Sequence, residues 1–255
     1  PCCWSGWSRS AAGGGKRMFE EELEKAASLY GFPLEANQIR KFGVYYALLI
    51  EWNAKMNLTA ITEPQEFAVK HIIDSLTALR GIEGAASFRL IDVGTGAGFP
   101  GIPLKIVRPD MKLVLLDSLK KRVHFLAAAV EALGLKDVEC LHGRAEEAAR
   151  QHALRESFDV AVSRAVARLS VLAEYLLPFV RLGGRAIALK GLHSEEEAKE
   201  AGRAVQLLGS AAIEAIPVRL PGLSDKRAVL VMKKERLTPK EYPRKAGKPA
   251  KEPLL

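Results

Sequence analysis

Three glycines within five residues, Gly94, Gly96 and Gly98, form the part of the sequence best suited to binding a ligand. A short apolar run, residues 90–93, leads directly into them. Glycine adopts left-handed backbone conformations without strain and lets a ligand approach the main chain closely. A tight turn without a ligand is the simpler alternative, but three glycines at the end of a first strand would be costly as packing alone. The segment therefore predicts a cofactor site.

Two cofactor classes fit this turn. Residues 96–101 match the G-x-G-x-x-G pattern that binds dinucleotides, but the match starts two residues beyond the end of the strand. It also puts Pro100 and Pro103 in the first helical turn, where a pyrophosphate needs backbone N–H donors that proline lacks. S-adenosylmethionine carries no phosphate, so its site needs backbone room and a carboxylate, which Asp92 supplies. We therefore predict S-adenosylmethionine, with a nicotinamide-dependent oxidoreductase as the alternative.

Two acidic residues further along extend this site. Asp117 ends the next apolar run, where a carboxylate can accept hydrogen bonds from both ribose hydroxyls of either cofactor. It could instead cap a helix over residues 118–133. After a third run, the Ala145 N–H and the Glu146 side chain stand where they can meet an adenine edge, although Glu146 could simply complement a helix dipole.

The elements that must position these residues follow from the hydrophobic pattern. Residues 19–80 show helical periodicity broken at Pro33 and Pro64, which predicts an N-terminal helical cap. The helical spacing of Tyr45, Tyr46 and Trp52 favours packing inside this cap, with stacking on bases as the alternative. From Phe88 onward, short apolar runs alternate with helical stretches, as in a parallel α/β sheet. The five runs are 90–93, 113–117, 138–141, 158–163 and 186–189. Two more, 211–218 and 227–232, are expected to form an antiparallel edge pair.

The net charge of +8 is concentrated at the two ends. Residues 1–17 carry three basic residues and no acid, and residues 233–255 carry eight basic residues against three Glu, so the body is neutral. A domain-wide nucleic-acid surface therefore cannot be argued from charge, although the tail could bind phosphates. We expect a disordered extension over 1–17, a cap over 18–86, the α/β domain over 87–234, and an extended or disordered basic tail over 235–255.

The cysteines and the apolar runs bear on location. Cys2 and Cys3 lie in a Gly/Ser-rich head and Cys140 in a strand, which predicts neither a disulfide framework nor a metal site. No apolar run approaches the roughly 20 residues of a membrane span, so we expect a cytoplasmic protein.

Five motifs in the same order resemble the RsmG (GidB) family, the small-subunit ribosomal RNA methyltransferases G. They are Asn57-Leu58-Thr59; His71-Ile72-Ile73-Asp74-Ser75; the segment from Ile91 to Leu104; Leu116-Asp117-Ser118 with Lys121-Arg122-Val123; and Ser163-Arg164-Ala165. The resemblance runs from Met18 to the C-terminus. It implies a class I methyltransferase fold, Rossmann-like with a mostly parallel seven-stranded sheet. It also implies methylation of N7 of one guanine in the decoding-region loop of 16S ribosomal RNA in the small ribosomal subunit. Separately from the resemblance, we expect a monomer.

The resemblance also implies which residues bind S-adenosylmethionine. Carried over motif by motif, they are Gly94, Phe99, Asp117, Ser118, Leu119, Ala145, Glu146 and Arg164.

The sequence also bears on the chemistry. Enzymes that methylate exocyclic base nitrogens use an Asn/Asp-Pro-Pro-aromatic segment where this chain has Ser163-Arg164-Ala165-Val166, so that reaction is disfavoured. Methylation of a pyrimidine carbon needs a cysteine nucleophile, and it is also disfavoured because Cys140 lies within a predicted strand. Guanine N7 carries an in-plane lone pair and no proton, so positioning is the main contribution and no catalytic base is assigned.

Three basic residues at strand ends are candidate RNA contacts, namely Lys190, Lys226 and Arg227. His71 is left out of the site, because it is expected to form a hydrogen-bonded pair with Asp74 on the helix surface that joins the cap to the core. A ribosome-binding module that keeps the fold without catalysis remains a further alternative.

Overall fold

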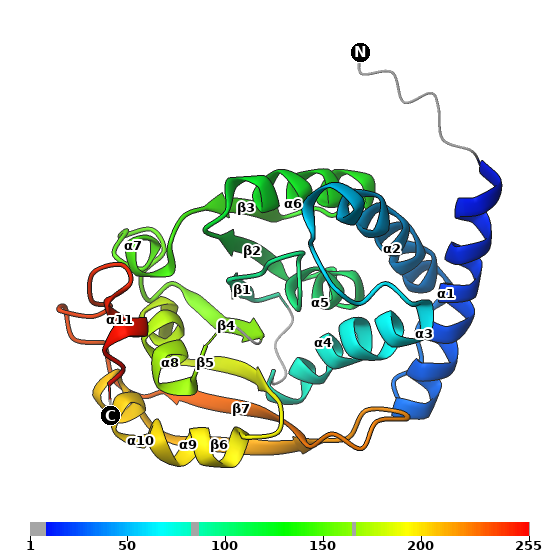
Figure 1. Ribbon diagram of the computed structural model, residues 1–255. Helices are drawn as coiled ribbons and strands as arrows, with labels where there is room; N and C mark the ends of the chain where they lie inside the picture. The colour runs from blue at the N-terminus through cyan, green and yellow to red at the C-terminus, as the bar shows by residue number, and fades with distance from the viewer. Residues whose placement is uncertain (1–8, 83–86, 165–166, 255) are drawn as a thin grey trace.

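The computed structural model describes residues 9–82, 87–164 and 167–254. Its centre is a seven-stranded sheet in the order β3-β2-β1-β4-β5-β7-β6 (Figure 1). The strands are β1 Arg89–Val93, β2 Lys112–Asp117, β3 Val138–His142, β4 Phe158–Arg164, β5 Val180–Lys190, β6 Ser210–Val218 and β7 Arg227–Lys234.

The pairing of these strands matches the predicted sheet. β1 to β5 pair in parallel, whereas β7 runs antiparallel to both β5 and β6. β5 is longer than the apolar run at 186–189 because it begins at Val180 and passes through the exposed residues 181–183. Those exposed positions carry no hydrophobic pattern, so the sequence did not mark them as strand.

The helices fall into two groups. The cap contains α1 Arg9–Tyr30, α2 Ala36–Met56, α3 Pro64–Phe67, the π-helical turn η1 Ala68–Ile73, α4 Asp74–Leu76 and η2 Thr77–Gly81. The helices that follow are α5 Gly101–Val107, α6 Lys120–Ala132, α7 Ala145–Ala148, α8 Leu169–Leu176, η3 Leu177–Phe179, α9 Ser194–Glu200, α10 Gly202–Leu207 and α11 Lys248–Lys251. Between β5 and β6 the chain forms two short helices, α9 and α10, that meet at Ala201.

The cap shares its hydrophobic core with one face of the sheet. Phe42 and Phe67 belong to the same buried cluster as Leu115 of β2 and Val231 of β7. A second cluster on the other face joins the sheet to α8 and α10. Figure 1 shows the sheet between these two helical layers. The cap therefore completes one layer of the fold.

Aromatic residues of α2 make this packing, as their helical spacing predicts. Tyr45 is fully buried, Tyr46 is 7% exposed, and the ring centroid of Trp52 lies 5.6 Å from that of Phe125 in α6. The helix starts with a capping box in which Glu35 and Gln38 bond each other's backbone N–H groups.

The first helix extends into the head that was expected to be disordered. α1 begins at Arg9, so this expectation is wrong for residues 9–17, while residues 1–8 lie outside the described part. Ion pairs at i,i+4 spacing, Lys16–Glu20 at 3.7 Å and Arg17–Glu21 at 3.1 Å, link the head to the following turns.

The basic tail is packed against the body, so of the two expected states, extended or disordered, the disordered one does not hold for residues 235–254. Thr238 is 3% exposed, and the fully buried Lys234 ammonium donates to the carbonyl oxygen of Leu177 at 2.8 Å. Arg155 donates to the carbonyl oxygens of Thr238 and Tyr242, each at 2.8 Å. The tail has little regular structure, but side chains of the body satisfy its backbone.

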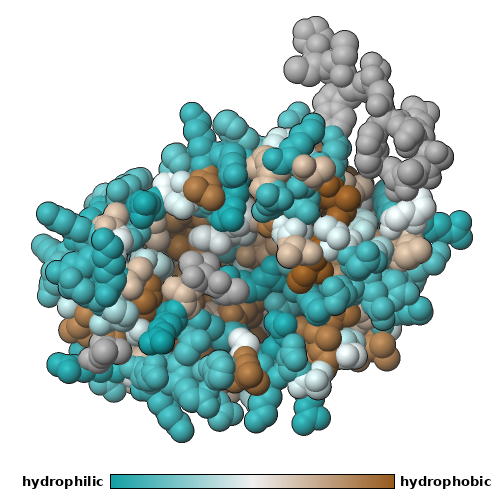
Figure 2. Space-filling view, viewed as in Figure 1, coloured by the Kyte–Doolittle hydropathy of each residue, from teal (hydrophilic) through white to brown (hydrophobic). Residues whose placement is uncertain are grey.

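Across the described ranges, no helix is both long and apolar enough to cross a membrane. Figure 2 shows a largely hydrophilic face that is hollowed near its centre, with apolar side chains inside the hollow.

Candidate cofactor and substrate site

The glycine turn follows β1 and is held from both sides. Gly94, Gly96 and Gly98 have φ values of 69°, 62° and 100°, a region that favours glycine. The Gly94 N–H donates to the Leu116 carbonyl of β2 at 2.9 Å. A Cβ on Gly98 would lie 2.7 Å from the Tyr45 hydroxyl oxygen, whereas one on Gly96 would meet nothing within 4 Å. Gly98 is therefore needed for packing against the cap, and the main chain at Gly96 is open.

Asp92 lies beneath the turn and is fully buried. Its Oδ2 accepts hydrogen bonds from the Thr95 hydroxyl at 2.6 Å and from the Gly101 N–H at 2.8 Å. Burial raises the pKa of Asp92 to about 7. Oδ2 thus holds the two ends of the turn together, while Oδ1 is buried without a hydrogen-bond partner among the described residues, so the role of this carboxylate toward the cofactor stays a prediction.

Asp117 joins the turn to the segment after β2. Its Oδ2 accepts from the Gly96 N–H at 2.9 Å and its Oδ1 from the Leu119 N–H at 2.8 Å. The N-cap of α6 is Leu119, so Asp117 is not the helix cap that the sequence left open as an alternative. Each carboxylate oxygen can accept a second hydrogen bond, which leaves Asp117 able to bind a ribose.

A cavity of about 150 Å³, here the adenosine cavity, opens at the carboxyl ends of β1, β2 and β3. It brings together four predicted residues, Gly94, Ser118, Ala145 and Glu146. Tyr175 of α8 also lines it, a residue that the sequence did not mark because it follows no strand. Apolar walls, an aromatic ring and a carboxylate acceptor suit the adenosine part of S-adenosylmethionine.

A second cavity of about 580 Å³, here the substrate cavity, lies at the ends of β4 and β5 and the start of β7. Arg164, Lys190 and Arg227 line it together with His71 and Asp74 of the cap. Lys226 is exposed and lines a neighbouring cavity of about 590 Å³ instead. The structure thus gathers two of the three candidate RNA contacts beside Arg164.

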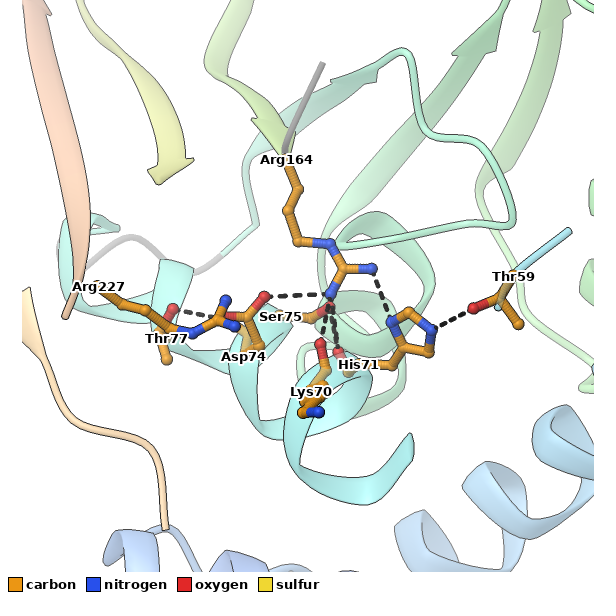
Figure 3. Close-up of polar contacts among 8 residues, drawn as sticks. All are labelled: Thr59, Lys70, His71, Asp74, Ser75, Thr77, Arg164 and Arg227. Atoms are coloured by element: carbon orange, nitrogen blue, oxygen red, sulfur yellow. Dashed lines mark hydrogen bonds and ion pairs between the residues drawn. The ribbon is translucent and has the colours of Figure 1, made fainter. Parts of the chain in front are cut away.

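An ion-pair network links Asp74, Arg164 and Arg227 at the substrate cavity (Figure 3). Asp74 Oδ2 lies 3.2 Å from Arg164 Nη1, and its Oδ1 lies 3.0 Å from Arg227 Nη1. Arg164 Nη1 also donates to the Lys70 carbonyl at 3.1 Å. One carboxylate of the cap therefore holds the end of β4 and the start of β7 at a fixed separation.

His71 is part of this network and is 8% exposed, and its ring bonds Arg164 and Thr59, so the expected surface pair with Asp74 is wrong, whereas its expected place between cap and core is confirmed. Arg164 Nη2 can only donate, so His71 Nδ1 accepts at 3.0 Å, and Nε2–H donates to the Thr59 hydroxyl at 2.7 Å. Burial, together with the Arg164 charge, lowers the pKa of His71 to about 3. The imidazole is neutral and both of its nitrogens are bonded.

Phe99 packs against His71 and Arg164 of this network. Its ring stacks on His71 with centroids 4.5 Å apart, and the Arg164 Cζ lies 4.8 Å from its centroid. Phe99 is 5% exposed and lines neither the adenosine cavity nor the substrate cavity. The structure therefore places Phe99 at the junction of cap and turn.

The Lys190 ammonium contacts other protein groups. It donates to the Ala167 carbonyl and lies 2.7 Å from Glu197 Oε2, and its side chain is 7% exposed. Among the predicted RNA contacts, Arg227 is also paired, whereas Lys226 is exposed.

The glycine turn, the acidic residue ending β2 and a mostly parallel seven-stranded sheet with β7 antiparallel together define a class I methyltransferase. The model of the family "rRNA small subunit methyltransferase G", GidB, matches residues 38–220. The chain belongs to this family.

Curated relatives and solved structures agree with this assignment. Proteins named "Ribosomal RNA small subunit methyltransferase G" include one from Desulforamulus reducens, 49% identical over 91% of this chain and 97% of its own length. Another, from Acetivibrio thermocellus, is 49% identical over 93% of this chain and 100% of its own length.

Among solved structures, M. jannaschii TYW2 in complex with AdoMet has a TM-score of 0.51 at 14% identity, covering 66% of this chain and 76% of that chain. A predicted O-methyltransferase from Agrobacterium tumefaciens has a TM-score of 0.52 at 18% identity, covering 65% of this chain and 83% of that chain. The expected family, fold class and cofactor class, S-adenosylmethionine, are confirmed.

Proposed function

We propose that the chain acts as a monomer and methylates N7 of a guanine in 16S ribosomal RNA of the small ribosomal subunit. The shared name of the curated relatives supports the RNA substrate. S-adenosylmethionine supplies an activated methyl group when bound. The residues that hold it in this proposal are Gly94, Asp117, Ser118, Leu119, Ala145, Glu146 and Arg164, while Phe99, which lines neither cavity, supports the glycine turn from the cap side.

The observation that carries the N7 assignment is that the acid–base groups on the inner wall of the substrate cavity are already engaged. Asp74 pairs with two arginines, and Glu197 pairs with Lys190 and accepts the Leu169 N–H at 2.9 Å. His71 is neutral and bonded at both nitrogens. Guanine N7 brings its own lone pair and loses no proton, so such a wall suits it without a general base.

Cations at the rim favour a phosphate-bearing substrate. Lys226 is exposed and the side chain of Arg227 is 24% exposed while it holds Asp74. An Arg or Lys at this position can donate to guanine O6 or to a phosphate oxygen. We assign Lys226 and Arg227 as the RNA contacts next to the target base, and Lys190 as support for the wall.

Methyl transfer to unmethylated small subunits tests the proposal. With labelled S-adenosylmethionine, we expect label in the RNA that is recovered as 7-methylguanine after hydrolysis. Label in another base position would contradict the N7 assignment. Cofactor binding without transfer would favour the non-catalytic module, and binding of a nicotinamide cofactor instead would favour the oxidoreductase.

Two variants sharpen this test. His193, exposed at the start of α9, is the remaining histidine that lines the substrate cavity, so His193→Ala should transfer methyl groups like the wild type. The single ammonium of Arg164→Lys cannot contact both Asp74 and His71 as the guanidinium does, so this variant should slow methyl transfer by about 10- to 100-fold. Loss of transfer in His193→Ala would show that a base is required and would contradict N7 as the acceptor.

A further inference from the structure

The C-terminal tail lies beside the two helices that form one wall of the adenosine cavity. Figure 1 shows α11 next to α7 and α8. Glu146 of α7 and Tyr175 of α8 both line that cavity. A segment from the end of the chain is thus packed behind a wall whose front faces the ligand.

One main-chain hydrogen bond connects the tail to this wall. The Gly247 N–H donates to Glu146 Oε1 at 2.8 Å, and Glu146 is 5% exposed. Gly247 has a φ of 81°, in the left-handed region that glycine adopts without strain, and it comes directly before α11. This bond restrains the side chain of Glu146, which lies on a helix of only four residues. A side chain that is already restrained loses less conformational entropy when a ligand binds to it.

An ion pair fixes the tail just before this bond. Glu174, fully buried and adjacent to Tyr175, accepts from the Arg244 N–H at 2.7 Å and from Arg244 Nη2 at 2.7 Å. Arg150 donates to the Pro243 carbonyl at 2.7 Å. Gly247 is therefore held by its neighbours at a set distance from α7.

We propose that residues 244–247 are a positioning segment for cofactor binding, in which Gly247 occupies Oε1 of Glu146 and thereby directs Oε2 toward the amino group of the adenine. This inference rests on the proposed binding of S-adenosylmethionine in the adenosine cavity. The segment touches the nucleoside end and not the methyl group. Its loss raises the Kd and the KM for S-adenosylmethionine and leaves kcat at saturating cofactor unchanged.

Substitutions at Gly247 that differ in the N–H donor test this role. Gly247→Pro removes the donor and the positive φ, whereas Gly247→Asn keeps the donor and tolerates the left-handed region. A Cβ at this position would meet nothing within 4 Å, so added volume is not the cause of any effect. Gly134→Pro is the matched control, because Gly134 has a φ of 59°, equally open space, and an N–H that donates to the Glu131 carbonyl at 3.0 Å. Gly134 precedes β3, at the end of the sheet opposite the cavities.

The measurements are calorimetric titration of the full-length variants with S-adenosylmethionine and with 5′-methylthioadenosine, and the unfolding midpoint of each. We expect Gly247→Pro to raise the Kd for both ligands by about 10-fold, as loss of one hydrogen bond to a charged group predicts. Gly247→Asn and Gly134→Pro should bind like the wild type. Equal binding by Gly247→Pro and the wild type would overturn the positioning role, as would an equal loss in Gly134→Pro. Absence of binding in the wild type would instead contradict the proposed cofactor site itself.

Discussion

Arg164 Nη2 lies 3.0 Å from His71 Nδ1, and this bond joins the end of β4 to the π-helical turn of the cap. The same guanidinium lies above the ring of Phe99, which follows the glycine turn. The cap, the sheet and the turn therefore meet at one arginine. All three thereby contribute to the position of this side chain in the wall of the substrate cavity.

The neutral state of His71 predicts a specific pH dependence of stability. Its pKa falls from 6.5 in the unfolded chain to about 3 in the folded one, so below pH 6.5 the unfolded chain binds the extra proton. The wild type should therefore lose unfolding free energy, relative to His71→Gln, as pH falls from about 6.5 toward 4, on the order of 1 kcal/mol per pH unit. Urea unfolding across this range checks the result, and parallel curves for the two proteins would contradict a buried neutral imidazole.

Asp92 should give the opposite slope. Its pKa is raised from 3.8 to about 7 by burial, so the folded chain binds the extra proton between these values. Its contribution is fully present below about pH 4 and is lost as pH rises through 7, whereas Asp92→Asn has no such loss while Asn can still accept from Thr95 and Gly101. In the same urea series the wild type should weaken relative to Asp92→Asn with rising pH. A slope of the same sign as for His71→Gln would refute this assignment.

The Arg244–Glu174 pair should show strong coupling in unfolding experiments. Arg244→Met leaves the fully buried Glu174 carboxylate without its guanidinium partner, with only the backbone N–H of residue 244 remaining, and should lower the unfolding free energy by about 3 to 5 kcal/mol. The double variant Arg244→Met/Glu174→Gln should recover most of that loss, because no buried charge remains. A double-mutant cycle by chemical denaturation measures the coupling, and simple additivity of the two changes would argue against the pair.

Two of the candidate RNA contacts, Lys226 and Lys190, should differ in how their loss affects RNA binding and stability. Lys226→Ala should reduce the slope of log K against log salt for RNA binding by about one, with unchanged stability. Lys190→Ala removes an ammonium that contacts Ala167 and Glu197, so it should lower stability first. Lys136→Ala, exposed at the opposite end of the sheet, is the control and should leave the slope unchanged. An unchanged slope in Lys226→Ala would remove Lys226 from the RNA surface.

Local patterns were enough to predict the fold and part of the site. Apolar runs and helical periodicity are properties of neighbouring residues, so the strands and the cap could be predicted from them. Gly94, Ser118, Ala145 and Glu146 follow strands that end at the same edge of the sheet, and this is why the structure brings them together in one cavity.

Contacts between distant parts of the chain could not be predicted in this way. Gly247 meets Glu146 across 101 positions, and Arg155 reaches carbonyl oxygens in the tail. The composition of the tail suggested an extended or disordered segment, because composition does not reveal which side chains of the body bind the tail in the folded chain. His71 was misplaced for the same reason, since its partner Arg164 lies 93 residues away.

The position of β7 in the sheet affects how the chain folds while it is being synthesised. β7 comes last among the strands along the chain but lies between β5 and β6. A ribosome therefore releases β6 before the strand that will connect it to the sheet exists, and β5 and β6 both keep unpaired edges until residue 234 has emerged. Nascent chains that stall before β7 would present two open strand edges, which are templates for aggregation.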